Sequence, residues 1–482
     1  MAKTMKFFNL TGGLNTEQGL YTINSTENRT ESPDMKNIEY YKLSGLKVQP
    51  GNILLGNLDS HTVIGGYEYH KGNNYYLVVG TNVGDIYLYD DEYKKFNKIF
   101  SYGTVCERLV FCNYADGLVI ANGKDNLVYY VKDREEEPQE NLYNIKVNLS
   151  TNSSSEYIIT RALATTINEM SFSSLGIGDR IYIYNNETDK KFETPFEIVK
   201  INTVEDITKE KESLVVAPVG AFTGTFTGSN LHIKLSNISV IGEHLHNTDP
   251  NNTVADAGRI VGSALANYKG RIWVANPEGG IYYSELGNIH GWDIYYDAGV
   301  IAESEEDKSF VTALGIWSEY LVVHKKQSSY LLNATDDDSS KWEYKPYTES
   351  TCRGPYSYSS NDRGYYLYSD TNQGVYPLLS RSVYNTTYMG KELSYKIRSR
   401  FDKLDTTKQD QIFVAYDPVK QYMCFYMNML DGNGYSNKCY IYCFLTQSWL
   451  YREVPQNVTI AFSCNNKIYI GTYEGDVLEE FS

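Results

Sequence analysis

The sequence has few basic residues and no long apolar run. Forty-four Lys and Arg stand against 60 Asp and Glu in 482 residues, which gives a formal net charge of −16. An acidic chain without a cluster of Lys and Arg repels nucleic acid, which argues against a protein that reads a nucleic-acid sequence. An acidic wall would still suit a conduit through which DNA passes without sticking. Because no segment is apolar enough to cross a bilayer and no signal-peptide pattern occurs, we expect a soluble protein that is not secreted by the classical route.

Cysteine is also scarce, and its spacing does not suggest pairing. The seven cysteines are an odd number and include no Cys-x-x-Cys pair. Cys439 and Cys443 lie four residues apart in an expected strand, so they share one face but are too far apart to bond directly. We therefore expect reduced thiols in a protein made in the cytoplasm.

Sequence signatures of catalysis are missing as well. No nucleophile elbow, phosphate-binding loop or dinucleotide-binding fingerprint occurs, so we expect neither an enzyme nor a cofactor. The acidic runs at 303–307 and 336–338 offer the oxygen ligands that calcium prefers. Neither run has the spacing of a calcium-binding loop, and solvated acidic turns are far commoner.

One histidine pair is the remaining candidate for a metal site. His244 and His246, with Glu243 and Asp249 nearby, would place two imidazoles on the same face of a strand. A metal site needs a further placed ligand, which the sequence does not identify. We therefore predict no metal-binding residue and no catalytic residue.

What the sequence has in abundance is tyrosine, with 45 copies, and a repeated pair of aromatic strands. The pattern NNYYLVVGTNVGDIYLYD begins at Asn73, and similar strings recur down the chain. Tyrosine favours strands, and a codon usage rich in Tyr, Asn and Lys explains its abundance equally well. The offset between the paired strands is more regular than composition explains, because it runs from 73 to 84, from 115 to 126 and from 269 to 279. Aligned on the second strand of the pair, the seven units fall at Gly84, Asn126, Gly279, Ser328, Gln373, Asn437 and Gly475.

Flanking strands complete each unit into a meander of four. VIGGYEYH precedes the first pair and KFNKIFS follows it, and most units repeat at the spacing of a propeller blade. The pattern predicts an all-β protein, a β-propeller of about seven, alternatively six, four-stranded blades. The last unit lacks a fourth strand, and the segment 45–56 is expected to supply it and close the ring.

Two interruptions of the repeat divide the chain. Residues 1–60 are expected to form an N-terminal arm with the closing strand, and residues 61–132 the first blades. A charged, proline-containing linker, DREEEPQE, then opens an insertion at 133–252 that we interpret as a small β-barrel or sandwich. The remaining blades occupy 253–482, with a shorter insertion near 381–408.

Two elements near the N-terminus resemble the opening of the tail hub, or nozzle, proteins of short-tailed bacteriophages, also known as packaged-DNA stabilization proteins. That family opens with a Gly-Gly-Leu-Asn-Thr-like element and continues to a Gly-x-Leu…Pro-Gly element. The basic residues often found before the Pro-Gly are reduced here to Lys47. The matching positions are Gly12, Gly13, Leu14, Asn15 and Thr16 for the first element, and Gly45, Leu46, Pro50 and Gly51 for the second.

A second stretch, GGIYYSELGNIHGWDIYYDAG from Gly279, is similar to the same family. The family has a strand ending in Tyr/Phe-Ser, a turn with Gly and Asn or Asp, an aromatic residue, and then a blade with a Leu-Val-Val strand. The matching positions here are Tyr283, Ser284, Gly287, Trp292, Leu321, Val322, Val323 and Ser329.

The resemblance implies a structural virion protein located in the phage tail and made in the host cytoplasm. Members of the family form a homo-oligomeric ring, usually a hexamer, below the portal and the head-to-tail adaptor. The ring seals the packaged genome and conducts the DNA, without sequence specificity, during ejection. Tail fibres or distal tail proteins are further implied partners, and abundant exposed tyrosine would suit the subunit interfaces.

Two other interpretations remain open at this stage. A propeller could instead bind or hydrolyse glycans in its axial channel, and a tight cluster of carboxylates at one channel mouth would favour that function. A scaffold protein unrelated to phages is the third alternative, against which the Gly-Gly-Leu-Asn-Thr element argues.

Overall fold

A computed structural model gives the structure of most of the chain. The described residues are 12–17, 25–26, 29–32, 34–41, 45–134, 147–151, 156–161, 175, 178–185, 190–191, 194–202, 213–219, 228–241, 260–292, 297–301, 309–336, 338–369, 371–381 and 386–480.

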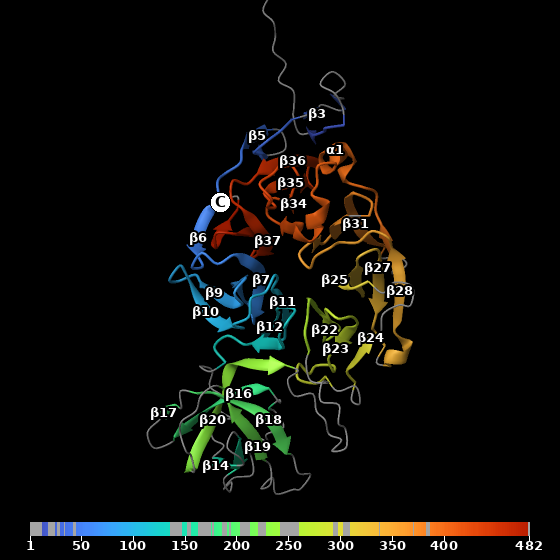
Figure 1. Ribbon diagram of the computed structural model, residues 1–482. Coiled ribbons are helices and arrows are strands. Elements are labelled where there is room, and N and C mark those ends of the chain that lie inside the picture. Colours follow the sequence, from blue (N-terminus) through green and yellow to red (C-terminus); the bar gives the residue numbers. More distant parts are fainter. Residues whose placement is uncertain are drawn as a thin grey trace, which may run out of the picture.

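Antiparallel meanders of four strands, arranged around one axis, form the body of the molecule (Figure 1). Six are separate four-stranded sheets, and the seventh is the part β11-β12-β13-β20 of a ten-stranded sheet. The first blade consists of β7 (Val63–Lys71), β8 (Asn74–Thr81), β9 (Asp85–Asp90) and β10 (Lys95–Ser101), and the second of β11 (Val110–Tyr114), β12 (Gly117–Ala121), β13 (Leu127–Tyr130) and β20 (Gly228–Ile241). The third consists of β21 (Ala264–Tyr268), β22 (Arg271–Ala275), β23 (Ile281–Tyr283) and β24 (Gly299–Ile301), and the fourth of β25 (Val311–Trp317), β26 (Tyr320–Lys325), β27 (Ser329–Asn333) and β28 (Glu343–Thr348). The fifth blade consists of β29 (Tyr358–Asn361), β30 (Gly364–Ser369), β31 (Gly374–Arg381) and β32 (Thr386–Met389), and the sixth of β33 (Phe413–Asp417), β34 (Tyr422–Met427), β35 (Lys438–Cys443) and β36 (Ser448–Glu453). The seventh consists of β37 (Val458–Cys464), β38 (Lys467–Thr472), β39 (Asp476–Glu479) and β6 (Ile53–Asn57). The predicted fold class, an all-β propeller with an inserted β-domain, is confirmed.

The repeat found in the sequence corresponds to the second and third strands of each blade. Six of the seven aligned positions directly precede the third strand, and Gly279 lies two residues before β23. Gly84 and Gly475 have positive φ angles of 83° and 88°, which explains the glycine at this turn. The regular offset therefore reflects a short hairpin of similar length in six blades, and the sixth blade departs from it with the longer connection between β34 and β35.

The ring is closed by strands from both ends of the chain. The N-terminal strand β6 pairs antiparallel with β39, so that Leu54 lies opposite Leu478. This strand completes the last blade, which the C-terminal region supplies with three strands only. The closure joins distant parts of the chain by backbone hydrogen bonds, without a disulfide.

Burial is greatest in the middle strands of the blades and falls toward the rim. All six residues of β34 are buried, because this strand lies inside a blade with a neighbouring blade on each face. The outermost strand β10 instead has four exposed and three half-buried residues. Runs such as YMCFYM are therefore apolar on both faces, whereas rim strands carry the charged residues.

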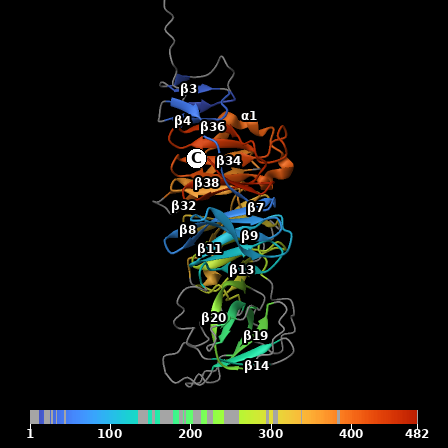
Figure 2. The same ribbon diagram turned by 90° about the vertical axis from the view of Figure 1, so that its left-hand side faces the viewer.

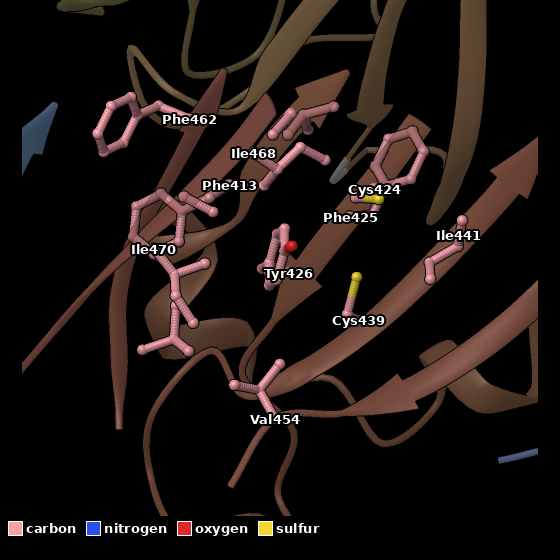
Figure 3. Close-up of a cluster of buried hydrophobic side chains, with 14 of the residues drawn as sticks. Phe413, Cys424, Phe425, Tyr426, Cys439, Ile441, Val454, Phe462, Ile468 and Ile470 are labelled. Carbon is pink, nitrogen blue, oxygen red and sulfur yellow. The ribbon is translucent and has the colours of Figure 1, made fainter. Parts of the chain in front are cut away.

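Adjacent blades share their cores. Figure 3 shows Phe413, Cys424, Tyr426 and Cys439 of one blade facing the Ile468 and Ile470 side of the next. Tyrosine fills much of this space: Tyr69, Tyr365 and Tyr426 are among the largest fully buried side chains. The exposed tyrosines of the described residues are Tyr75, Tyr93, Tyr395 and Tyr473, while seventeen others are buried. The expectation that exposed tyrosines are abundant is therefore wrong for the described chain.

The insertion forms a closed six-stranded barrel. Its strands pair in the order β14-β15-β19-β18-β16-β20, and β20 also pairs with β14, which closes the cylinder. The barrel strands not yet given are β14 (Val147–Thr151), β15 (Tyr157–Arg161), β16 (Asp179–Asn185), β18 (Phe196–Asn202) and β19 (Ser213–Pro218), with a short β17 (Lys190–Lys191) at the edge. Its core is Tyr157, Ile159, Leu175, Ile181, Ile183, Phe196, Ile198, Leu214, Val216, Ile233 and Leu235.

One strand belongs to both the barrel and the propeller. The first part of β20 pairs with β14 and β16, and its last residues, 238–241, pair with β13 as the fourth strand of the second blade. The predicted insertion boundary at 252 therefore falls after the chain has already returned to the propeller.

The N-terminal residues form small sheets at the edge of the molecule opposite the barrel (Figures 1 and 2). They are β1 (Gly13–Leu14), β2 (Ser25–Thr26), β3 (Arg29–Ser32), β4 (Ile38–Tyr41) and β5 (Gly45–Val48). Short helices lie in the later connections: η2 (Ser339–Lys341), η3 (Ser394–Ile397), α1 (Arg398–Phe401) and η4 (Thr406–Gln411). The sequence also suggests a short helix within 160–170, but residues 162–170 lie outside the described residues.

Candidate functional site

The axis of the propeller is narrow and lined by side chains of all seven innermost strands. A cavity of about 350 Å³ lies there. The residues from the seven strands are Gly66, Val110, Leu265, Leu314, Ser359, Val414 and Ala461. A cavity of this size admits no DNA duplex, so any conduit for DNA would have to lie on the axis of an assembly of several copies.

Aromatic side chains fill the axial space. A Cβ on Gly66 would lie 2.0 Å from the Phe462 ring, so only glycine allows this close approach. The hydroxyl of Tyr356 donates to the carbonyl of Leu109 at 2.7 Å, which joins the fifth blade to the second. Burial raises the pKa of Tyr356 well above its usual value, so this hydroxyl stays protonated and acts as a structural donor.

A larger cavity, of about 790 Å³, opens at one mouth of the axis. It is lined by the turns between the second and third strands of five blades and by the segments that connect blades. The turn residues are Asn82, Asn122, Gly123, Lys124, Pro277, Asn433, Gly434, Tyr435 and Tyr473. The turns that define the sequence repeat therefore build the rim of this cavity.

One ion pair crosses the cavity mouth. Nη2 of Arg108 lies 3.1 Å from Oδ2 of Asp410 and also donates to the Asp410 carbonyl at 3.0 Å. Among the described residues, Glu107 is the only other carboxylate of the lining. The mouth therefore lacks, among its described lining residues, the tight carboxylate cluster that would favour a hydrolase.

The Gly-Gly-Leu-Asn-Thr element is built into the sixth blade. Gly13 has a φ of 77°, and a Cβ there would lie 2.6 Å from the carbonyl oxygen of Trp449 and 2.7 Å from Cβ of Ser448. The next residue, Leu14, is 1% exposed and belongs to the largest core cluster of the propeller. Glycine is required by conformation and space, and leucine anchors the segment.

Polar contacts connect the same element to the 381–408 insertion. The side-chain amide of Asn15 donates to Glu31 at 2.6 Å, and the other oxygen of Glu31 lies 2.5 Å from Nζ of Lys396. The amide of Thr16 donates to the Lys396 carbonyl at 2.8 Å. The sequence predicts that the N-terminal element and the insertion are separate parts of the molecule. In the structure they form one unit.

The β4–β5 hairpin, which contains the second part of the family resemblance, docks on the same blade through a buried carboxylate. Glu39 is 1% exposed. Its Oε1 lies 2.7 Å from Nζ of Lys47 and its Oε2 lies 3.0 Å from Nζ of Lys420. Lys47 therefore stabilises the hairpin, although the sequence showed it only as the remainder of a basic run. Beyond the hairpin, Pro50 is half-buried, and Gly51 is exposed with open space around it.

The second family-like stretch organises a buried arginine in the third blade. Nη1 of Arg271 donates to the carbonyls of Ser284 and Asp297 at 2.9 and 2.8 Å, and Nη2 lies 2.6 Å from Oδ2 of Asp297. The Ser284 hydroxyl accepts from the amide of Ile272 at 3.0 Å. The guanidinium lies 5.7 Å from the Tyr283 ring centroid.

The turn that follows is held by the remaining residues of this stretch. Gly287 has a φ of 73°, and its amide donates to the carbonyl of Gly270 at 3.0 Å. The indole of Trp292 donates to the carbonyl of Ile289 at 2.8 Å. All these contacts are within the chain, so the matched residues have structural roles here. Leu321, Val322 and Val323 are likewise buried in β26.

The sequence-derived metal candidates give no site in the described part of the chain. His244, His246, Glu243 and Asp249 lie outside the described residues, as does the run 303–307. Asp338 caps η2 by accepting from the amide of Ser340, and Asp336 pairs with Lys341 at 3.2 Å. Within the described residues, no three His, Cys, Asp or Glu side chains form a group that could hold a metal ion.

A buried charge at the junction of barrel and propeller was not apparent in the sequence. Asp179 of β16 is 1% exposed and accepts from the Ser239 hydroxyl at 2.5 Å. Arg134 and His290 each place a nitrogen 3.4 Å from Oδ1 of Asp179. Burial alone would raise the pKa of Asp179, but the two nitrogen groups and the hydroxyl outweigh burial and hold it well below its usual range. The four residues are distant in sequence, so no local pattern marks them.

His324 is a second buried polar residue that sequence reasoning missed. Its two ring nitrogens each lie 2.8 Å from a hydroxyl, of Ser329 and of Tyr365. Burial lowers the pKa of His324 to about 3, so the ring is neutral at physiological pH. Ser329, one of the family-like residues, thus provides a hydrogen-bond partner for His324 in the core between two blades.

All seven cysteines are free and buried, as expected for reduced thiols. Cys439 and Cys443 lie on one strand without bonding. No helix in the described part of the chain is long and apolar enough to cross a membrane.

Comparisons with known proteins extend to the fold alone. No family model matches the chain, and no curated protein matches it. Solved structures with a similar course of the chain include the computationally designed Ika8 protein, with 12% identity, 89% of this chain and 100% of that one covered, and a TM-score of 0.41. Another is the β-propeller domain of Cps50 (Swd1) from Myceliophteria thermophila, with 8% identity, 89% of this chain and 99% of that one covered, and a TM-score of 0.44. A third is BamB from Moraxella catarrhalis, with 11% identity, 90% of this chain and 96% of that one covered, and a TM-score of 0.39. The propeller assignment rests on the sheet topology of the chain itself.

Proposed function

We propose that this chain is the tail hub, or nozzle, subunit of a short-tailed bacteriophage. Copies of the chain would form a ring, a hexamer by analogy with the family, below the portal and adaptor. The ring would seal the packaged DNA and conduct it during ejection. The function is mechanical and involves no catalytic residue.

The observation that carries the proposal is the place of the Gly-Gly-Leu-Asn-Thr element. The residues that suggested the family are not part of a loose extension, because Gly13 and Leu14 are packed into the sixth blade and Asn15 is hydrogen-bonded within its docked unit. A motif whose side chains have defined structural roles is a better guide to relationship than a chance match of small residues.

The shape of the molecule suits a subunit that contacts several neighbours. The barrel lies at one edge of the propeller, and the N-terminal sheets lie at the opposite edge (Figures 1 and 2). The two appendages are each fixed to their blade, one through the shared strand β20 and the other through Leu14 and Glu39. A rigid body with fixed appendages at both ends can join a ring and still reach a partner above or below it.

The net charge of −16 also suits a conduit. An acidic wall repels the phosphate backbone, so that DNA moves past it without binding. The axial cavity of one propeller is too small for this purpose, and the DNA would pass along the axis of the ring. The competing hydrolase function has less support, because Glu107 and Asp410 are the only carboxylates among the described residues of the cavity mouth and Asp410 is paired with Arg108.

Quantitative proteomics of gradient-purified virus particles from the source culture tests the proposal. We expect the chain to co-purify with capsids at a copy number comparable with that of the portal protein. An abundant host cytoplasmic protein measured in the same fractions is the control for contamination. If the chain is found in the lysate and not in the particles, the tail-hub function is wrong.

A further inference from the structure

We propose that the 790 Å³ cavity at the mouth of the propeller axis binds a neutral oligosaccharide, with Tyr435 and Tyr473 as its stacking surface. This binding site does not depend on the tail-hub function, since a propeller in any assembly could present it.

Two tyrosines form an aromatic surface at the cavity rim. The ring centroids of Tyr435 and Tyr473 lie 5.5 Å apart, and the rings are inclined at 48°. Tyr473 is 53% exposed, whereas most tyrosines in the described chain are buried or half-buried. Neither hydroxyl has a hydrogen-bond partner among the described residues. Tyr435 is half-buried and packs against Tyr473, whose exposed ring offers an apolar face and a hydroxyl at its edge, which matches the C–H face and the hydroxyls of a sugar ring.

The turns that carry these tyrosines are held in place before any ligand arrives. The side-chain amide of Asn433 donates to Asn457 at 2.5 Å, and the amide of Tyr435 donates to Asn433 at 3.2 Å. The Thr62 hydroxyl donates to the carbonyl of Tyr473 at 3.1 Å. A surface that is already ordered loses little conformational entropy on binding.

Unsatisfied polar groups lie inside the same cavity. The side-chain oxygen of Asn82 is buried and accepts no hydrogen bond from the described residues. The exposed Glu107 and the half-buried Gln411 also line the cavity, with side chains that make no hydrogen bond to the described protein residues and are open to solvent or a ligand. Amide and carboxylate groups of this kind are suited to the many hydroxyls of a carbohydrate.

The charges of the lining are close to balanced. Arg108 is paired with Asp410. Nζ of Lys124 donates to the carbonyl of Val105 at 2.8 Å, and Nζ of Lys408 donates to the carbonyl of Gly434 at 2.7 Å, which orients the two ammonium groups without removing their charge. Glu107 opposes that charge. A lining without a large excess of positive charge favours a neutral sugar over a multiply charged anion such as a sulfated glycan.

The test is binding of the full chain to an array of neutral, sialylated and sulfated glycans, followed by titration calorimetry with each glycan that binds. The variants are Tyr473→Ala and, separately, Tyr435→Ala. Tyr93→Ala is the matched control, because Tyr93 is 67% exposed and lies between β9 and β10, at the opposite end of β9 from the cavity turn. All three sites have exposed or half-exposed side chains, so the variants are expected to fold.

We expect a neutral glycan to bind and Tyr473→Ala to weaken it by about tenfold or more, as truncation of an aromatic anchor does. Tyr93→Ala should leave the affinity unchanged. The proposal is overturned if no neutral glycan binds, if only anionic glycans bind, or if the cavity variants and the Tyr93 control bind equally well. Copy number in virus particles is a separate measurement, so the tail-hub function can fail while the binding site stands, and the reverse.

Discussion

The carboxylate of Asp410 accepts a hydrogen bond from Nη2 of Arg108 at 3.1 Å, although 302 residues separate the two in sequence. Arg108 precedes the second blade and Asp410 precedes the sixth. Only a closed ring of blades brings these segments together across the axis. The pair is therefore a sensitive local marker of ring closure, even though its own energy is small.

We expect Arg108→Gln to lower the free energy of unfolding by less than about 1 kcal/mol, because both partners are partly solvated, with side-chain exposures of 29% and 49%. Arg271→Gln should cost about 2 to 3 kcal/mol, since the Arg271 side chain is 6% exposed and its loss leaves the carbonyls of Ser284 and Asp297 without their donor. Urea unfolding of both variants measures the difference. Equal losses would contradict this ranking.

The glycines of the family-like N-terminal elements offer a matched pair. Gly13→Ala places a methyl group 2.6 Å from the carbonyl oxygen of Trp449 at a positive φ, which should cost about 1 to 3 kcal/mol. Gly51→Ala meets nothing within 4 Å and should be neutral. Thermal unfolding gives the stability of each variant, and limited proteolysis shows whether the N-terminal segment is released. A Gly13→Ala variant as stable and as resistant as Gly51→Ala would show that the segment does not pack as described.

The sequence could predict the blades because their signal is local and repeated. In six of the seven blades the hairpin between the second and third strands is short and of similar length, and the sixth blade has a longer connection between β34 and β35. The aligned position recurs directly before β9, β13, β27, β31, β35 and β39. The sequence alone does not distinguish strands at the rim from strands in the interior of a blade. Whether both faces of a strand such as β34 are buried depends on the neighbouring blades, which are distant in the sequence.

The contacts that join the parts of the molecule could not be predicted. Asp179, Arg134 and His290 come from three separate segments, and Glu39 meets a lysine 381 residues away. The residues next to each of them in the sequence form no motif that would mark a long-range contact. The composition also suggested tyrosines at interfaces, whereas the interior between the blades takes most of those described, because large aromatic rings fill the space between twisted sheets.

The cysteines provide a chemical test of the core. Burial raises the pKa of Cys106 to about 11 and that of Cys112 to about 12, and all seven thiols are buried and free. Because the thiolate is the reactive form, Ellman's reagent at pH 8 should react slowly with the native chain and quickly with seven thiols in guanidinium. Pretreatment with a reductant should not change that number. Fewer than seven thiols in the untreated denatured sample would reveal a disulfide.

The junction between barrel and propeller should respond to acid. The pKa of Asp179 lies well below its usual value in the folded chain, so its contribution to stability is present above about pH 4, the usual range of an unfolded Asp. That contribution is lost as the pH falls from there towards the lower folded value. Asp179→Asn leaves Arg134 and His290 without their carboxylate and should destabilise the junction by about 3 kcal/mol at pH 7.

Hydrogen exchange of peptides covering β16, corrected for the intrinsic pH dependence of exchange, measures this effect. The difference between Asp179→Asn and the native chain should be large at pH 7 and should shrink below pH 4, because Asp179 then begins to bind a proton in the opened state, while it stays ionised in the folded state until a lower pH. Asp336→Asn is the control, since Asp336 is exposed and follows β27, away from the junction, where its carboxylate pairs with the exposed Lys341 and accepts from the amide of Asp338. This variant should behave as the native chain does at β16 at every pH. A difference for Asp179→Asn that grows as the pH falls would mean that the carboxylate does not stabilise the junction through its charge.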